Sequence, residues 1–282
     1  MAQMIDVIPR REHSALTSMR YWLKMIWQTL NPIIIGMLIL ASLWQVAAWI
    51  SDGALPTPLA TASTLGELLS NPFYDNGPND KGIGIQLLAS LGRVFTGWGI
   101  GIAIAIPLGM LLGSSARLRK MLAPVIEILR PVSPLAWYPL GLAVLHNAPK
   151  AVVFAIVITS LWPTLVNTTM GVQNIPADLK AVSKVFRFSR WRYISKVLLP
   201  AAFPAILTGM RLSMGIAWMV IVAGEMLAGG TGLGFFVWDS WNALSLERVM
   251  SAILIIGITG LCLDRVFSVV GQRMAAWQEG GH

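Results

Sequence analysis

The sequence predicts an all-α polytopic membrane protein, and three observations support that prediction. Hydrophobic residues make up 55% of the 282 positions and charged residues only 12%, about half the charged share of a soluble globular protein. The mean hydropathy is +0.67. Six stretches hold about 20 predominantly apolar residues each, the length that crosses the hydrocarbon core of a bilayer. This composition excludes a soluble enzyme, a disordered chain and a fibrous repeat.

The six predicted spans differ in regularity. They cover about residues 31–50, 92–113, 123–145, 149–170, 203–227 and 249–271. The third span is the least regular because it carries Pro124, Pro131, Pro134 and Pro139, and each proline removes an amide donor. Such backbone persists at membrane depth only where it is buried in protein or lines a wet cavity. The third span therefore favours a transport pathway over a membrane scaffold.

Residues 1–30 are predicted to form a cytoplasmic segment with an amphipathic helix. Apolar residues recur at helical spacing, and Arg20, Lys24 and Gln28 fall on the opposite face. A helix of this kind lies in the headgroup region of a membrane. The apolar positions are Leu16, Met19, Leu23, Ile26, Trp27 and Leu30. Residues 272–282 are predicted to form a cytoplasmic tail.

The formal charge of +8 is explained by membrane orientation. With both termini inside, the cytoplasmic pieces are 1–30, 114–122, 171–202 and the tail after about 264. They hold fifteen of the 21 lysines and arginines, whereas the outer pieces hold three. Lysine and arginine collect on the cytoplasmic side of membrane proteins. The sequence therefore predicts an N-in and C-in topology with lipid contact, and nucleic-acid binding is not needed to explain the charge.

The second span carries a small residue at every fourth position. These residues are Gly97, Gly101, Ala105, Gly109 and Gly113. Small residues on one helix face let another backbone approach closely in a membrane. We therefore expect the second span to be a central, tightly packed helix.

The largest predicted cytoplasmic connection, residues 171–202, contains six cations together with Phe186, Phe188 and Trp191. Pro176 suits a helix start, so we expect a short helix over Ala177–Phe186. After it we expect a turn at 188–190 and then a second helix over Trp191–Leu198, which Pro200 ends. A basic loop lying on anionic lipid would explain the cations. A docking element for a cytoplasmic partner would explain both the cations and the aromatic residues.

This connection resembles the EAA loop of ABC-importer permeases, in which Glu-Ala-Ala is followed by Gly, a hydrophobic residue and Leu-Pro. Aligned on Leu199-Pro200, the Glu position is Ala181 and the Gly position is Arg187. Neighbouring segments resemble the nitrate, sulfonate and taurine branch of these permeases, and nitrate permeases most closely. They include LRPVSPLAWYPLGLA at 129–143 and GGTGLGFFVWDSWN at 229–242.

The resemblance implies the MetI-like fold, with six transmembrane helices and the N-terminal amphipathic helix, in the bacterial inner (plasma) membrane. It implies a permease of an ATP-driven importer, working as two copies with two cytoplasmic ATPase subunits. A periplasmic or lipid-anchored solute-binding protein would deliver nitrate or nitrite. Bicarbonate, cyanate and an alkanesulfonate such as taurine are alternative substrates. A stand-alone secondary transporter or channel is a more remote alternative.

The chain itself is not expected to be an enzyme or to hold a cofactor or metal. No lysine follows a glycine, so the phosphate-binding loop G-x-x-x-x-G-K-[ST] does not occur. ATP and Mg²⁺ would therefore bind to the partner ATPase. The single cysteine excludes an intrachain disulfide.

Two sets of residues are functional candidates. A charge at membrane depth faces protein or water, so the charged pathway candidates are Arg211, Arg130 and Glu127. Glu127 is expected to pair with Arg130. Trp137 and Trp218 are the aromatic pathway candidates. The resemblance implies the ATPase-coupling candidates Ala181, Ser183, Lys184, Phe186, Arg187, Phe188 and Trp191. Two further charges have other expected roles: Arg93 would reach the headgroups near an outer span end, and Glu225 would brace the loop after it.

Overall fold

The computed structural model describes residues 15–279, and the regular structure in this range is helical. The chain divides into two compact units, residues 1–60 and 61–282. The predicted features at 1–14 and 280–282 lie outside the described residues.

The first unit contains α1 (Ala15–Ile50), which runs without a break through residue 30. The predicted N-terminal helix and the first span are therefore parts of one helix. The Trp44 indole N–H donates to the Pro56 carbonyl at 3.0 Å, which holds the following turn against the end of α1. α2 (Pro58–Ser70) begins directly afterwards.

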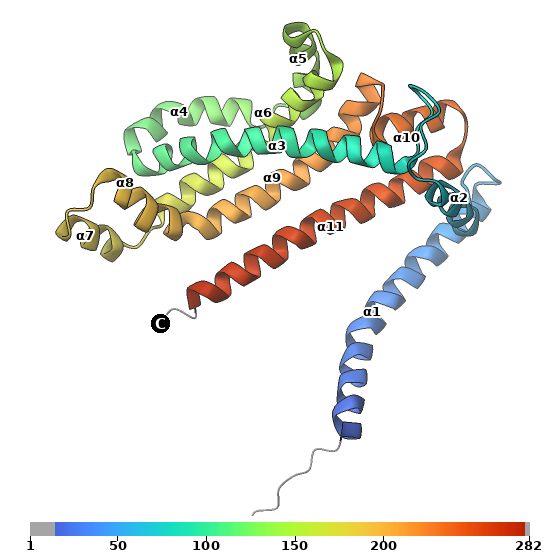
Figure 1. The fold of residues 1–282 in the computed structure, drawn as a ribbon, viewed down its shortest axis with the longest axis horizontal. Helices are drawn as coiled ribbons and strands as arrows, with labels where there is room; N and C mark the ends of the chain where they lie inside the picture. The colour runs from blue at the N-terminus through green and yellow to red at the C-terminus, as the bar shows by residue number, and fades with distance from the viewer. Residues whose placement is uncertain (1–14, 280–282) are drawn as a thin grey trace, which may run out of the picture. The chain divides into compact units, whose positions relative to one another are not determined.

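Three long helices form the core of the second unit and lie side by side (Figure 1). They are α3 (Ile83–Ser114), α6 (Ala148–Gln173) and α9 (Leu199–Ala228). α3 starts nine residues earlier than the predicted second span. α9 is buried against the other two helices along much of its length.

The predicted small-residue face of α3 packs directly on α6. A Cβ atom placed on Gly97 would collide with Ile156, and one on Gly109 would collide with Thr168. Gly101 faces Ser160 and Gly113 faces Val172 in the same register. The two backbones therefore approach closely along the whole contact, as the four-residue spacing predicted.

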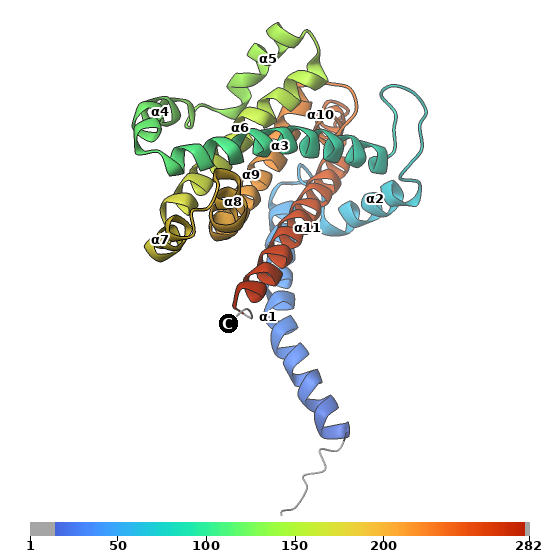
Figure 2. The same cartoon turned by 60° about the vertical axis from the view of Figure 1, so that its left-hand side comes forward.

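The predicted third span is not one helix. α4 (Ala116–Leu129) and the pair η1 (Pro134–Ala136) and α5 (Trp137–Leu145) meet at an angle of 90°. Figure 2 shows the non-helical connection between α4 and α5. The break lies between Arg130, which is still helical, and Pro134. Ser133 has a ψ of 132°, because a residue before proline is driven out of the helical region. Most of the predicted link 114–122 belongs to α4, which begins after the N-cap Ser115.

The predicted coupling loop forms α7 (Ala177–Val185), α8 (Arg190–Tyr193) and the π-helical turn η2 (Ile194–Leu198). The amides of Arg187 and Phe188 donate back to Lys184 and Ser183, which closes a Schellman motif. Arg187 therefore adopts a left-handed conformation, with φ of 49°, at the position where the resemblance implied glycine.

Pro200 does not end a helix, contrary to the sequence prediction. The helical path is continuous from Arg190 to Ala228, and Pro200 lies in the first turn of α9. Immediately before it the chain takes the π-helical geometry of η2, a local widening that lets a helix change register. The fifth span therefore begins earlier than the predicted Phe203.

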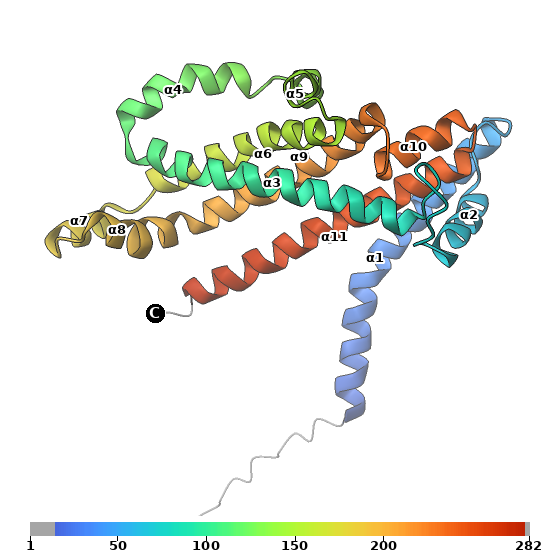
Figure 3. The same cartoon turned by 45° about the horizontal axis from the view of Figure 1, so that its top comes forward.

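α10 (Leu233–Asn242) and α11 (Leu246–Glu279) complete the second unit. Figures 1 and 3 show α10 at one end of the α3–α6–α9 core and α7 with α8 at the other. Of the described helices, four are long and apolar enough to cross a bilayer, or five if α4 and α5 count as one span. The described apolar part of α1, Ile34–Ile50, is shorter, so the total of six stays a prediction.

The loop between α2 and α3 is closed by polar contacts. Lys81 donates to Asp75 at 3.0 Å, and the Tyr74 hydroxyl donates to Asp80 at 2.9 Å. The hydrogen bond from Lys81 lowers the pKa of Asp75 below its ordinary value. Neither acid in this loop is therefore left without a hydrogen-bond donor.

The close α3–α6 contact generates the first prediction. A Cβ atom on Gly109 would lie 2.6 Å from the Cβ of Thr168 and 3.0 Å from the Leu165 carbonyl oxygen, whereas Gly99 has nothing within 4 Å. Gly109→Leu should therefore force the helices apart and lower the thermal midpoint of the detergent-purified protein by several degrees. Gly99→Leu is the matched control and should leave it nearly unchanged. Equal midpoints for the two variants would contradict the close contact.

Candidate functional site: a hollow at the broken helix and two anchoring ends

The break between α4 and α5 borders a hollow of about 410 Å³. Its lining comes from the break itself and from the facing sides of α6 and α9. The lining residues are Arg130, Pro131, Val132, Pro134, Thr159, Trp162, Pro163, Val166, Asn167, Leu212 and Ile216. Irregular backbone at membrane depth is tolerated where it lines a cavity, and the proline-rich break does line this hollow. We call this feature the Arg130 hollow.

Arg130 is the only charged residue among those lining the hollow. Glu127, its predicted partner, lines a second, smaller hollow of about 200 Å³ that Arg130 also borders. No ion pair joins the two residues in the described part of the chain, so the predicted pairing is wrong for this conformation. Arg130 is exposed.

Arg211, the stronger sequence candidate, does not border the Arg130 hollow. Its Nε and Nη2 atoms donate to the two carboxylate oxygens of Asp264 on α11, at 2.6 and 2.7 Å. Such a bidentate pair is strong and geometrically specific. Arg211 therefore has a neutralising partner. Arg211 borders other hollows than Arg130 does.

Asp264 was missed because its partner lies 53 positions away in the sequence. Asp264 could have been found as a lone carboxylate in an otherwise apolar stretch, since a charged group at membrane depth needs a partner.

The predicted tryptophans have structural roles. Trp218 is buried, and its indole N–H donates to the Ile256 carbonyl at 3.0 Å, which joins α9 to α11. Trp137 packs against the main core cluster. Neither lines the Arg130 hollow. Trp162 is the aromatic residue that lines the Arg130 hollow, and Thr159 and Asn167 are its polar neighbours on the same helix. The sequence analysis did not single out these two polar residues.

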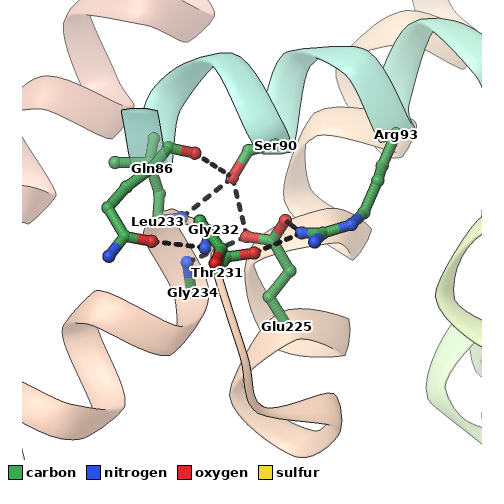
Figure 4. Close-up of polar contacts among 8 residues, drawn as sticks. All are labelled: Gln86, Ser90, Arg93, Glu225, Thr231, Gly232, Leu233 and Gly234. Atoms are coloured by element: carbon green, nitrogen blue, oxygen red, sulfur yellow. Dashed lines mark hydrogen bonds and ion pairs between the residues drawn. The ribbon is translucent and has the colours of Figure 1, made fainter. Parts of the chain in front are cut away.

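A second polar site joins α3 to the loop after α9 (Figure 4). The carboxylate of Glu225, which is 1% exposed, accepts from Ser90 at 2.7 Å, from Arg93 at 2.5 Å and from the Gly234 amide at 3.1 Å. A buried carboxylate is stable only when paired and hydrogen-bonded. The expectation that Glu225 braces the following loop is therefore confirmed.

Arg93 is part of this network and does not serve as a headgroup anchor. It also donates to the Thr231 carbonyl at 2.6 Å, so the backbone of the loop after α9 is tied to α3 as well. The sequence expectation for Arg93 was wrong because its partner Glu225 lies 132 positions away.

The loop backbone fits this network because it is rich in glycine. Gly229, Gly230 and Gly232 have positive φ angles, which glycine adopts at little cost. A Cβ on Gly232 would collide with the Glu225 carboxylate. The Gly232 amide donates to Gln86, and the Leu233 amide donates to Ser90. The motif at 229–234 is therefore shaped to wrap around a buried acid.

The predicted coupling residues lie together at the opposite end of α9 from this network (Figure 1). Phe186 is 69% exposed and Trp191 is 77% exposed. Ala181, Lys184 and Arg187 are also exposed. Phe188 is half-buried, and its ring centroid lies 6.4 Å from that of Phe186. The Arg192 guanidinium lies over the Phe188 ring. Ser183 is buried and donates to the Lys180 carbonyl, so it is not available to a partner.

The network predicts a large effect of losing one charge. Arg93→Leu would leave Glu225 buried without its cation, which typically costs about 3 kcal/mol or more. We expect a clear fall in the thermal midpoint of the purified protein. Arg117→Leu removes an exposed arginine of α4 and should have little effect. If both variants matched the parent, the network would not be a stability element.

Comparison with known proteins agrees with this architecture. The chain is 42% identical over 231 residues to the nitrate import permease protein NrtB of Synechocystis sp., covering 82% of this chain and 84% of the relative. It is 39% identical over 281 residues to the bicarbonate transport system permease protein CmpB of Synechocystis sp., covering 98% and 100%.

Among solved structures, a chain of the inward-facing MetNI methionine ABC transporter has a TM-score of 0.58 at 16% identity. The match covers 66% of this chain and 93% of that chain, and it shows a shared MetI-like fold. The family described as binding-protein-dependent transport system inner membrane component matches residues 105–276. The chain therefore belongs to this family of inner-membrane, multi-pass permease subunits of ABC transporters.

Proposed function

We propose that the chain forms the membrane pathway of an ATP-driven importer for nitrate or nitrite. The observation that carries the proposal is Arg130 at the border of a 410 Å³ hollow, where it is the single charged lining residue and has no ion-pair partner among the described residues. A guanidinium offers paired donors to a planar oxyanion. Its attraction is strong where the surrounding dielectric constant is low. The relative that is 42% identical is named as a nitrate import permease.

The hollow is suited to passage, because only part of its lining is polar. Thr159 donates to the Ala155 carbonyl at 2.8 Å and Asn167 donates to the Pro163 carbonyl at 2.8 Å. The Arg130 charge therefore attracts an anion without a full cage of donors around it. A pathway must bind its ion weakly enough to release it.

Bicarbonate is the second candidate substrate. The relative named as a bicarbonate transport permease is 39% identical and aligns over 98% of this chain. Bicarbonate is also a small planar oxyanion of single charge, so a guanidinium recognises both ions by the same chemistry. Nitrate has first place in the proposal because of the higher identity of its relative.

The energy for transport would come from two ATPase subunits that bind ATP and Mg²⁺ and seat the coupling loop at α7 and α8. A solute-binding protein would deliver the anion at the opposite face, and two copies of this chain would enclose the pathway. In this arrangement both termini are cytoplasmic. α9 links the coupling loop directly to the Arg130 hollow, because it starts beside α8 and carries Leu212 and Ile216.

Removal of the Arg130 charge tests the pathway. Arg130→Gln should lower the uptake of labelled nitrate in cells at least tenfold, while membrane expression and assembly stay at the parent level. Arg130→Lys should retain part of the activity, since the charge remains and the paired donors are lost. Arg117→Gln is the control for an exposed cytoplasmic arginine. Parent-level uptake by Arg130→Gln would refute the assignment of the pathway.

The Arg211–Asp264 pair leads to a different expectation. Arg211→Gln should reduce the amount of folded protein in the membrane, because Asp264 loses both of its donors. The double variant Arg211→Gln/Asp264→Asn should recover it, since no unpaired charge remains. Uptake should be normalised to the folded protein in each variant. A specific uptake defect that the double variant does not repair would place Arg211 in the pathway.

Coupling is tested at the exposed aromatic residues. Phe186→Asp should release the ATPase or uncouple it from transport, because exposed aromatic anchors carry much of an interface's energy, about 2 kcal/mol or more each. Leu179→Asp, at a less exposed position in α7, the helix that Phe186 caps, serves as a comparison. Normal co-purification and normal transport of Phe186→Asp would rule out a docking role for this residue.

A further inference from the structure

The coupling loop contains a basic hollow of its own. α7, the turn after it and α8 surround a space of about 430 Å³. Four of its lining residues are cations, namely Lys180, Lys184, Arg187 and Arg190. The remaining lining residues include Phe188 and Tyr193, which supply apolar walls. We call this feature the basic hollow.

The cations of the basic hollow have no counter-charge in an ion pair within the part of the chain that the structure describes. Asp178 is the only acidic residue between positions 171 and 202, and it lies in the first turn of α7, outside the hollow lining. The ion pairs of the described residues all lie elsewhere in the chain. Four like charges around one concave surface repel one another, and an anionic group placed among them would relieve that repulsion.

The apolar surface beside the hollow is also left uncovered by the described residues. Val185 is 77% exposed, and Phe186 and Trp191 are similarly exposed. Anionic lipid headgroups would neutralise the cations but would not enclose two aromatic side chains at the tip of a helical loop. A protein partner with a groove accounts for both features at once.

We propose that the basic hollow receives carboxylate side chains of the ATPase subunit, so that this loop is the cationic side of the coupling interface. This inference rests on the proposed function, because it specifies the chemistry of the same interface. The exposed residue Ala181 offers no carboxylate. The loop therefore contributes six cations and a single acidic residue, Asp178, and the matching groove has to be acidic.

The inference also assigns a role to the strained turn. Arg187 has a φ of 49°, a conformation that glycine adopts more readily. An arginine at this position places a guanidinium in the hollow lining beside Lys184. A charge at the centre of the proposed interface therefore gives this left-handed position a function.

The experiment uses the full chain co-expressed with the ATPase of the same transport system and placed in nanodiscs of neutral lipid. ATPase dissociation is followed at 50 mM and 500 mM NaCl for the parent and for Lys184→Glu/Arg190→Glu. The matched control is Arg117→Glu/Lys120→Glu, which reverses two exposed cations of α4. A carbodiimide that joins amines directly to carboxylates is then applied to the parent, and the cross-linked peptides are identified by mass spectrometry.

We expect the ATPase to dissociate at least tenfold faster at high salt and at least tenfold faster from Lys184→Glu/Arg190→Glu, because losing close charge pairs raises dissociation rates. Lys180 or Lys184 should be cross-linked to Asp or Glu of the ATPase, whereas Lys120 should not. The α4 control should behave like the parent.

Three results would overturn the inference. Salt-independent binding that survives the double charge reversal, without cross-links, would mean that the interface is apolar, and the proposed function would stand. Binding that requires anionic lipid would assign the cations to headgroups. Failure of the parent chain to bind any ATPase would refute both the inference and the proposed coupling.

Discussion

Direct contact between the backbones of α3 and α6 is the constraint on which the rest of the second unit depends. Four glycines of α3 face α6 in one register, and a side chain at any of them would separate the helices. This contact fixes the orientation of α6 around its own axis. Ile156, Ser160 and Thr168 then point to α3, and Thr159, Trp162 and Val166 border the Arg130 hollow. The position of the hollow is therefore a consequence of helix packing.

The bilayer imposes a second condition, that charges inside it must be compensated. Glu225 satisfies this condition with Ser90, Arg93 and a backbone amide, and Arg211 satisfies it with Asp264. Arg130 lacks such a partner in the described part of the chain. Among the described residues, this contrast between Arg130 and Arg211 is the reason that Arg130 carries the proposed pathway role.

Sequence reasoning succeeded where the signal was local. The four-residue spacing of small residues predicted the face that α6 covers, Pro176 predicted the start of α7, and the prolines at 131 and 134 predicted an irregular third span. It failed where partners are distant, because the pairs Arg93–Glu225 and Arg211–Asp264 depend on which helices become neighbours. The continuous helix through Pro200 was also missed, since a π-helical turn leaves no clear trace in composition.

Arg130 is the single charged residue lining the Arg130 hollow, and the local electrostatic potential tests its proposed role most directly. A cysteine is introduced as Val166→Cys in a Cys262→Ser background, with Arg130 present or replaced by Gln. The rates of modification by anionic and cationic methanethiosulfonate reagents are compared in the reconstituted protein. With Arg130 present, the anionic reagent should react several-fold faster relative to the cationic reagent, and Arg130→Gln should abolish that preference. A rate ratio that does not depend on Arg130 would contradict the account.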